Sequence, residues 1–230
     1  HRAVILMGPR RVGKTVLLHQ VIQRLIDEGV PSTDILYLSI DTPLLQGLEL
    51  EELVDLYQEI HQKKNLNACV VIFDEIQYHD EWDRHLKVLV DGHKKTRFMA
   101  SGSAAAALRR RAKESGAGRF TDFLLPPLTF HEYLGLLDLT KNLLTGDGIP
   151  KSKNIEKLNK EFQNYLNYGG YPEAIFNKEI QDKPERFVRS DIIEKVLLRD
   201  LPSLYGIHDI QELTRLFNTL AYQTGNEVTL

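Results

Sequence analysis

The sequence predicts an α/β fold in which a parallel sheet carries helices on both faces and a smaller α-helical module follows. Short, wholly apolar runs alternate with amphipathic helical segments through the first half of the chain. The first of these runs passes through a glycine-containing turn into a helical pattern. After about residue 126 the strand-like runs give way to helical segments. Repeated strand–helix units of this length indicate parallel strands joined by helical crossovers.

Five segments have the length and apolar character of buried strands. They are residues 4–7, 35–38, 70–73, 97–100 and 123–125. The fifth is predicted to end at Pro126, because proline has no N–H to donate to a neighbouring strand. The core domain is therefore expected to cover residues 1–126.

Apolar residues recur with helical spacing between these strands and after them. The first such helix covers about residues 16–26, and Gly29 and Pro31 are the stop signals that follow it. The other predicted helices are 49–62, 82–90, 129–137, 155–168, 172–176, 184–199 and 210–222. An α-helical module is expected over residues 127–205.

The composition excludes several classes of protein. A formal net charge of −3 provides no overall basic field for nucleic acid or a membrane surface. The single cysteine, Cys69, excludes an intrachain disulfide and lies in an apolar run, so we expect it to be buried. No apolar run approaches the roughly 20 residues that span a bilayer. The sequence opens at His1, already inside a strand-like run, so we expect a piece of a longer, cytoplasmic protein.

The segment 8–15, Gly-Pro-Arg-Arg-Val-Gly-Lys-Thr, matches the phosphate-binding pattern G-x-x-x-x-G-K-[ST] in full. Its backbone N–H groups can point at phosphate oxygens, and the following helix adds its positive N-terminal end. We expect Lys14 to reach the β- and γ-phosphates and Thr15 to bind Mg²⁺. A solvated position is an equally good interpretation of Arg10 and Arg11. The predicted nucleotide contacts are Gly8, Pro9, Arg10, Arg11, Val12, Gly13, Lys14, Thr15 and Val16.

Two carboxylates, Asp74 and Glu75, follow the third strand directly. In phosphate-loop proteins the first acidic residue after such a strand holds the Mg²⁺ shell. The next one is then placed to orient or deprotonate an attacking water. Without the upstream loop, an acidic turn that caps a helix would explain the pair. With that loop, we expect Asp74 to serve the metal and Glu75 to act as the catalytic base.

Two further candidates are polar residues after the fourth strand and an arginine before the fifth. Ser101 is predicted to face the phosphates if its strand lies between the two motif-bearing strands. Ser103 fits that role or a cap on a helix over residues 104–108 equally well. Arg119 is a candidate arginine finger or a solvated loop residue. The histidines lack the spacing of H-E-x-x-H, and the pattern predicts no metal site made by them.

These motifs together resemble a branch of the AAA+ ATPases, a bacterial and archaeal group described only as ATP-binding proteins. The resemblance rests on segment 8–18, on Asp-Glu-Ile-Gln at 74–77 with Trp82 downstream, and on Ala-Ser-Gly-Ser at 100–103. It continues in Gly-Arg at 118–119, in Leu-Pro-Pro-Leu-Thr-Phe at 125–130 and in Gly-Gly-Tyr-Pro-Glu at 169–173. The last two segments are the ones specific to the group.

The resemblance implies a sheet in the order 5-1-4-3-2, a catalytic glutamate, and Ser101 or Ser103 at the polar sensor position. It also implies that residues 206–230 begin a winged-helix-like segment that the sequence cuts short. The implied function is ATP or ADP binding with Mg²⁺, with ATP hydrolysis driving a molecular switch or motor. The alternative is a nucleotide-regulated DNA-binding or signalling module with little turnover. Homo-oligomers, and DNA or protein partners of the C-terminal part, are compatible with both.

Overall fold

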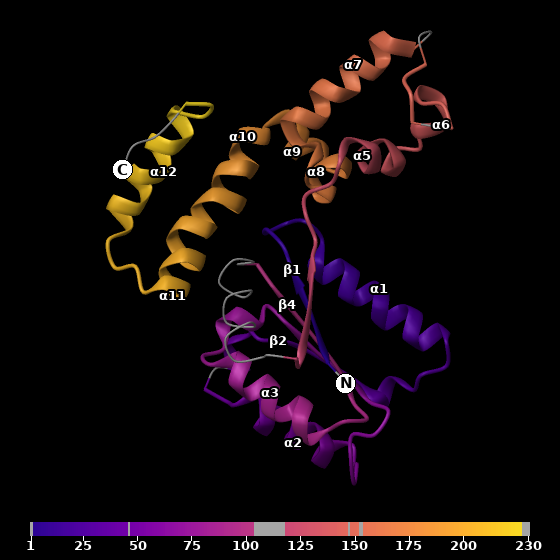
Figure 1. Ribbon diagram of the computed structural model, residues 1–230, viewed down its shortest axis with the longest axis vertical. Coiled ribbons are helices and arrows are strands. Elements are labelled where there is room, and N and C mark those ends of the chain that lie inside the picture. The colour runs from indigo at the N-terminus through magenta and orange to yellow at the C-terminus, as the bar shows by residue number, and fades with distance from the viewer. Residues whose placement is uncertain (1, 46, 104–117, 147, 152–153, 227–230) are drawn as a thin grey trace. The chain divides into compact units, whose positions relative to one another are not determined.

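The computed structural model describes residues 2–45, 47–103, 118–146, 148–151 and 154–226 (Figure 1). The chain divides into two compact units, residues 1–178 and 179–230. The first contains the whole sheet and the helices that follow it up to residue 176. The domain boundaries predicted from the sequence, near residues 126 and 205, stay predictions.

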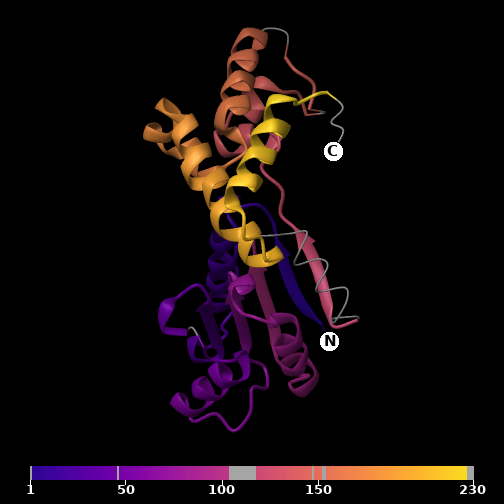
Figure 2. The same ribbon diagram turned by 90° about the vertical axis from the view of Figure 1, so that its left-hand side faces the viewer.

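The first unit is built on a five-stranded parallel sheet. Its strands are β1 Ala3–Met7, β2 Ile35–Ser39, β3 Val70–Asp74, β4 Arg97–Gly102 and β5 Phe120–Leu124. They lie in the order β2-β3-β4-β1-β5, and every pairing is parallel. This is the expected order 5-1-4-3-2 read from the other edge, so the prediction is confirmed. Figure 2 shows β5 at the edge of the sheet beside β1.

The predicted position of the fifth strand was wrong by three residues at its start. The strand begins at Phe120, which pairs with Ala3, and not at residue 123. The polar pair Thr121 and Asp122 interrupts the apolar pattern and hid this start. Polar side chains are tolerated there because β5 is an edge strand with a partner on one side only.

Helices cover both faces of the sheet, as predicted (Figure 1). On one face, α1 Lys14–Asp27 packs Leu18 and Leu25 against Leu6 and Ile72. On the other face lie α2 Leu50–Ile60 and α3 Trp82–Gly92. Because side chains alternate along a strand, neighbouring residues of β1 and β3 belong to opposite cores.

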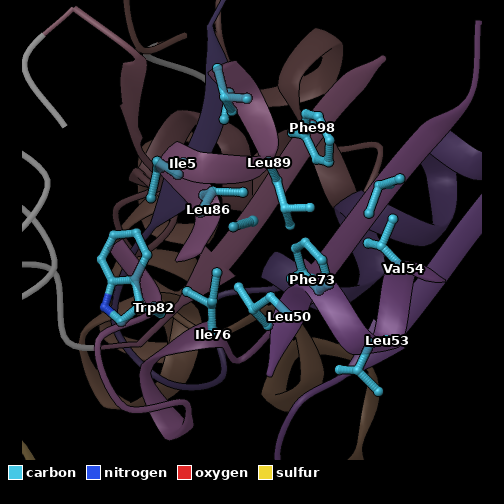
Figure 3. Packing of buried hydrophobic residues seen from close by; sticks show 14 of the residues in the cluster. Ile5, Leu50, Leu53, Val54, Phe73, Ile76, Trp82, Leu86, Leu89 and Phe98 are labelled. Atoms are coloured by element: carbon cyan, nitrogen blue, oxygen red, sulfur yellow. The ribbon is translucent and has the colours of Figure 1, made fainter. Parts of the chain in front are cut away.

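The larger of the two cores lies between the sheet and helices α2 and α3. Figure 3 shows Phe73 beside Leu50 and Leu89, with Trp82 at the edge of the cluster. Cys69 belongs to this core and is 1% exposed, as the sequence predicted. A rigid core of this kind holds the carboxyl ends of β1, β3 and β4 in place.

A helical module completes the first unit. It contains α5 Phe130–Leu136, α6 Thr140–Leu143, α7 Ile155–Asn164, the π-helical turn η5 Tyr165–Gly169 and α8 Pro172–Phe176. Thr129 starts α5 through a capping box, in which its Oγ1 accepts from the Glu132 N–H and its own N–H donates to the Glu132 carboxylate. The Thr129 N–H and hydroxyl both donate to the Glu132 carboxylate and lower its pKa. Tyr133, Leu134 and Leu158 are buried in the module's own core.

The second unit is also helical. Its elements are α9 Lys178–Asp182, which starts one residue before the unit, α10 Pro184–Arg186, the π-helical segments η6 Phe187–Ile193 and η7 Val196–Asp200, α11 Leu201–Tyr205 and α12 Ile210–Tyr222. The helix α12 has the bounds predicted for the first helix of a winged-helix-like segment, and that interpretation stays a prediction. Within the described residues, no helix is both long enough and apolar enough to cross a membrane.

Candidate functional site

The candidate site lies where three central strands end. Because β4 lies between β1 and β3, it brings the segment after Met7 close to the one after Phe73. The register pairs Met7 with Gly102 and Phe73 with Ala100. The prediction for Ser101 required its strand to lie between the two motif-bearing strands, and β4 does lie there. Ligands of parallel α/β sheets bind at this carboxyl edge.

The loop 8–15 requires its glycines for two different reasons. A Cβ on Gly8 would lie 2.3 Å from the carbonyl oxygen of Leu125, so only glycine fits between β1 and β5 at that point. Gly13 has a φ of 100°, which L side chains rarely adopt. Arg11 also has a positive φ, of 65°. These angles turn the chain sharply before α1 begins at Lys14.

Lys14 is folded into the loop that precedes it. Its Nζ donates to the carbonyl oxygens of Gly8 at 3.1 Å and Pro9 at 2.9 Å, and the residue is only 4% exposed. A buried ammonium group needs such partners because desolvation is costly. The same position, at the N-terminal end of α1, suits an anion that bears several oxygens.

Asp74 is the centre of a buried hydrogen-bond network and is 1% exposed. Its Oδ2 accepts from the Thr15 hydroxyl at 2.7 Å and from the Tyr37 hydroxyl at 2.9 Å. Its Oδ1 accepts from the Ser101 hydroxyl and from the Glu75 N–H at 3.1 Å. Burial, together with the bond to Asp74, raises the pKa of Tyr37, so its hydroxyl remains a donor. Residues of the loop 8–15, β2 and β4 thus meet at the Asp74 carboxylate at the end of β3.

Glu75 lies next to this network in a left-handed conformation, with a φ of 54°. Its carboxylate accepts from the side-chain amide of Gln77. The same amide nitrogen donates to the Ser103 hydroxyl at 3.0 Å, and Gln77 is 7% exposed. Gln77 therefore links the carboxylate of Glu75 to the end of β4. This arrangement holds the Glu75 carboxylate, which the sequence predicts to be the catalytic base, in position.

The two loop arginines have different protein partners. Arg10 donates to the Tyr78 hydroxyl. Arg11 forms an ion pair with Glu173, with Nη1 and Oε2 2.7 Å apart. Pro172 approaches the same loop, because a Cβ on Gly13 would lie 3.8 Å from its Cγ. The Gly-Gly-Tyr-Pro-Glu segment of the helical module therefore lies against the phosphate-binding loop.

The model of a family described as "AAA domain" matches residues 1–134 of the 230 in the chain. The chain belongs to this AAA family. The match covers the sheet, the loop 8–15, the Asp74 network and the start of the helical module. A second model, for a domain of unknown function (DUF8612), matches residues 159–230.

Curated relatives of the AAA protein extend well beyond it. An uncharacterized protein of Methanocaldococcus jannaschii, MJ1544, is 27% identical over 98% of this chain and 48% of its own length. An uncharacterized protein of Haemophilus influenzae is 28% identical over 97% of this chain and 52% of its own length. The chain thus spans about half the length of these relatives. A solved structure, the Aeropyrum pernix ORC2 protein in ADPNP–ADP complexes, aligns with a TM-score of 0.41 and 16% identity over 60% of this chain and 45% of its own.

The structure does not bring Arg119 to the candidate site of the AAA domain. Arg119 directly precedes β5, at the end of the sheet opposite to the loop. The five residues of β1 separate the two ends by roughly 16 Å, at about 3.3 Å a residue. Its Nε donates to Asp91 at 3.0 Å. A role as arginine finger is therefore open to it only toward a neighbouring subunit.

The remaining predicted residues differ in their surroundings. Val12 is 4% exposed and its side chain lies near Gly8, whereas Val16 is 61% exposed on the first turn of α1. Pro9 is exposed and contributes its carbonyl oxygen to Lys14. The helix expected over residues 104–108 lies outside the residues that the structure describes.

Sequence reasoning missed four side chains around the site, namely Tyr37, Gln77, Tyr78 and Glu173. The position of Tyr37 could have indicated its role. It lies near the carboxyl end of a predicted parallel strand, and such ends share one edge of the sheet. Gln77 and Glu173 stand in the segments that carry the family resemblance, without an assigned role. The contacts of Gln77 with Ser103 and of Glu173 with Arg11 join residues far apart in the chain.

Proposed function

We propose that this AAA domain binds ATP with Mg²⁺ at the loop 8–15 and hydrolyses it to ADP and phosphate. The observation that carries the proposal is the 2.7 Å hydrogen bond between Thr15 and the buried Asp74. It joins the two residues expected at the metal, one from each motif, beside a lysine folded into the loop. A helix-capping role for Asp74 would not require a hydroxyl from the loop.

The residues around Asp74 fit a magnesium ion by their chemistry. Hydroxyl and carboxylate oxygens are ligands that Mg²⁺ prefers, and Thr15 and Asp74 present one of each. When bound, Mg²⁺ neutralises negative charge on the β- and γ-phosphates. The hydroxyls of Tyr37 and Ser101 hold the Asp74 carboxylate in place.

Residues of the chain supply phosphate binding and proton transfer. Lys14 exchanges its bonds to Gly8 and Pro9 for the phosphate oxygens, and the N–H groups of the loop bind the same anion. Glu75 accepts the proton of the attacking water as general base. Gln77 positions the Glu75 carboxylate through its amide.

The hydrogen bond from Gln77 also supports a gated reaction. The Gln77 amide occupies one oxygen of the Glu75 carboxylate, and that oxygen can take a proton from water only after the bond is rearranged. We propose that the protein works as a switch or motor in which such a rearrangement sets the rate. A nucleotide-regulated module with little turnover, for DNA binding or signalling, is the second candidate, favoured by the same contact.

Further parts of the proposal concern the whole protein. We propose functional boundaries near residues 126 and 205, with residues 206–230 starting a winged-helix-like segment. DNA or a protein is the partner proposed for the C-terminal part, and a cytoplasmic location is part of the same proposal. DNA binding would weaken steeply with salt, because phosphate contacts release counterions. Measuring that slope with and without ATP separates the two candidate functions.

The decisive experiment is steady-state ATP hydrolysis by the full-length protein, with and without DNA. Lys14→Ala is expected to reduce ATP binding or turnover to near background, since it removes the ammonium group folded into the phosphate loop. Lys157→Ala, on an exposed position of α7, is the matched control and should behave as the parent. Parental affinity and turnover in a folded Lys14→Ala variant would rule out this loop as the nucleotide site.

A further inference from the structure

Outside the nucleotide site, three side chains from separate elements converge on one point. Glu49 precedes α2, His79 follows η3 Ile76–Tyr78, and His85 lies on α3. The Glu49 Oε2 atom is 3.3 Å from the His79 Nε2 and 2.9 Å from the His85 Nε2. One ligand atom from each residue lies within 4.8 Å of the others. The two imidazole rings meet edge to face, with centroids 5.1 Å apart.

The other nitrogen of each ring is bound to an acceptor. The His85 Nδ1 lies 2.8 Å from the Glu51 carboxylate, and the His79 Nδ1 contacts the carbonyl oxygen of Asp80. Since a carboxylate and a carbonyl can only accept, each ring donates from Nδ1. Each Nε2 then faces the same Glu49 oxygen, with which it can share either a proton or a metal ion. A metal ion at this point would be bound by one carboxylate oxygen and two imidazole nitrogens.

The arrangement has two features of a metal site, the second hydrogen bond of each histidine and the spacing of the ligand atoms. Histidine ligands of metals usually donate their second N–H to a carboxylate or a backbone carbonyl, and both rings do so here. In a tetrahedral zinc site with Zn–N bonds of 2.0–2.1 Å, neighbouring ligand atoms are about 3.3 Å apart. The separations of 3.3 and 2.9 Å lie close to that value. Two histidines and one glutamate are an established open zinc ligand set.

The surroundings leave room for a fourth ligand. A cavity of about 190 Å³ is lined by Glu49, His79 and Asp80 among others, so water can reach the cluster. The His79 side chain is 10% exposed and that of His85 24%, while Glu49 is 53% exposed. The histidines are thus largely held by the fold before any ion binds. Because the ligands come from three elements, the spacing in the sequence predicted no such site.

We propose that Glu49, His79 and His85 bind one Zn²⁺ ion, with water at the remaining position. The ion would tie the start of α2 to α3 and to the turn that follows the catalytic carboxylates. His79 is four residues after Glu75, and Gln77 between them holds the Glu75 carboxylate. The site is separate from the Thr15–Asp74 pair and does not depend on nucleotide.

The proposal is tested by titrating the nucleotide-free, metal-stripped full-length protein with Zn²⁺ in a calorimeter. We expect one equivalent to bind with micromolar or tighter affinity. At about 100-fold excess over the Kd, Zn²⁺ should raise the Tm by roughly 5–10 °C. Co²⁺ bound in its place should show the visible absorption of a four-coordinate ion. No saturable binding, or binding that leaves the Tm unchanged, would overturn the proposal.

Variants locate the ion. Replacing both histidines, as His79→Gln with His85→Gln, should abolish the specific equivalent, whereas the exposed His131→Gln on α5 should bind as the parent. Glu51→Gln should weaken binding about 10–100-fold without removing a ligand, because it orients His85. Asp74→Asn should leave Zn²⁺ affinity unchanged.

Other results with these variants would contradict the assignment. Equal Zn²⁺ affinity in the double histidine variant would place the ion elsewhere in the protein. If that variant does not fold, Glu49→Gln decides between the outcomes. At least a tenfold loss of affinity supports the site, and no loss overturns it.

Discussion

Replacing Glu75 by glutamine separates nucleotide binding from chemistry. The amide keeps the shape of the side chain, and its oxygen can still accept from Gln77. Glu75 is only partly buried and its left-handed backbone is equally open to glutamine. The Asp74 network, which holds the expected metal ligands, contains the N–H of Glu75 but not its carboxylate. The substitution should therefore leave the fold and ATP–Mg²⁺ binding nearly intact.

Turnover should fall much further than binding. A lost general base typically costs 10²–10⁴-fold in rate, equivalent to about 3–5 kcal/mol of transition-state stabilisation. Asp74→Asn provides the contrast, because it alters the acceptor of Thr15, Tyr37 and Ser101 together. That variant should weaken the Mg²⁺ dependence and hydrolysis at the same time.

The comparison needs phosphate release and nucleotide titration on the same folded preparations. A Glu75→Gln variant that hydrolyses ATP as fast as the parent would show that Glu75 is not the base. A parent that binds ATP but never turns it over would support the nucleotide-regulated module with little turnover.

Three further predictions follow from the contacts of the site. Ser101→Ala removes a donor to the buried Asp74 carboxylate and should lower the free energy of unfolding in urea by about 1.5–3 kcal/mol; an unchanged value would mean that this bond contributes nothing. Glu173→Gln releases Arg11 from a half-exposed ion pair worth less than about 1 kcal/mol, so ATP should bind up to about fivefold tighter; an unchanged Kd would exclude Arg11 as a ligand. Arg119→Ala should reduce turnover, and mixing it with Lys14→Ala subunits should restore part of it if Arg119 acts on a neighbour; turnover unaffected by Arg119→Ala would make it a bystander.

The phosphate loop and the carboxylate pair could be predicted because their spacing is local. Gly8, Gly13 and Lys14 lie within one short loop. The residues that shape this loop are therefore all visible in one segment of the sequence. The same holds for strands that are apolar throughout, such as β3, since burial on both faces leaves a continuous run. The start of β5 escaped prediction because an edge strand does not need that pattern.

Which side chains meet at the site was decided by the tertiary structure. The hydroxyls of Tyr37 and Ser101 reach Asp74 only because β2 and β4 flank β3 in the sheet. Similarly, Arg119 was a candidate by its family motif, and the direction of β5 carries it to the far end of the sheet.

By itself, the sequence determined the fold class, and it predicted the phosphate-binding loop and the roles of the two carboxylates after β3. Each of these depends on residues close together in the chain. Their periodicity predicts the strands and helices, and their spacing predicts the motifs. Only the tertiary structure decided that Glu173 pairs with Arg11 and that Glu49, His79 and His85 share one point. Contacts between distant segments depend on how strands are ordered and helices packed, and no local pattern records that order.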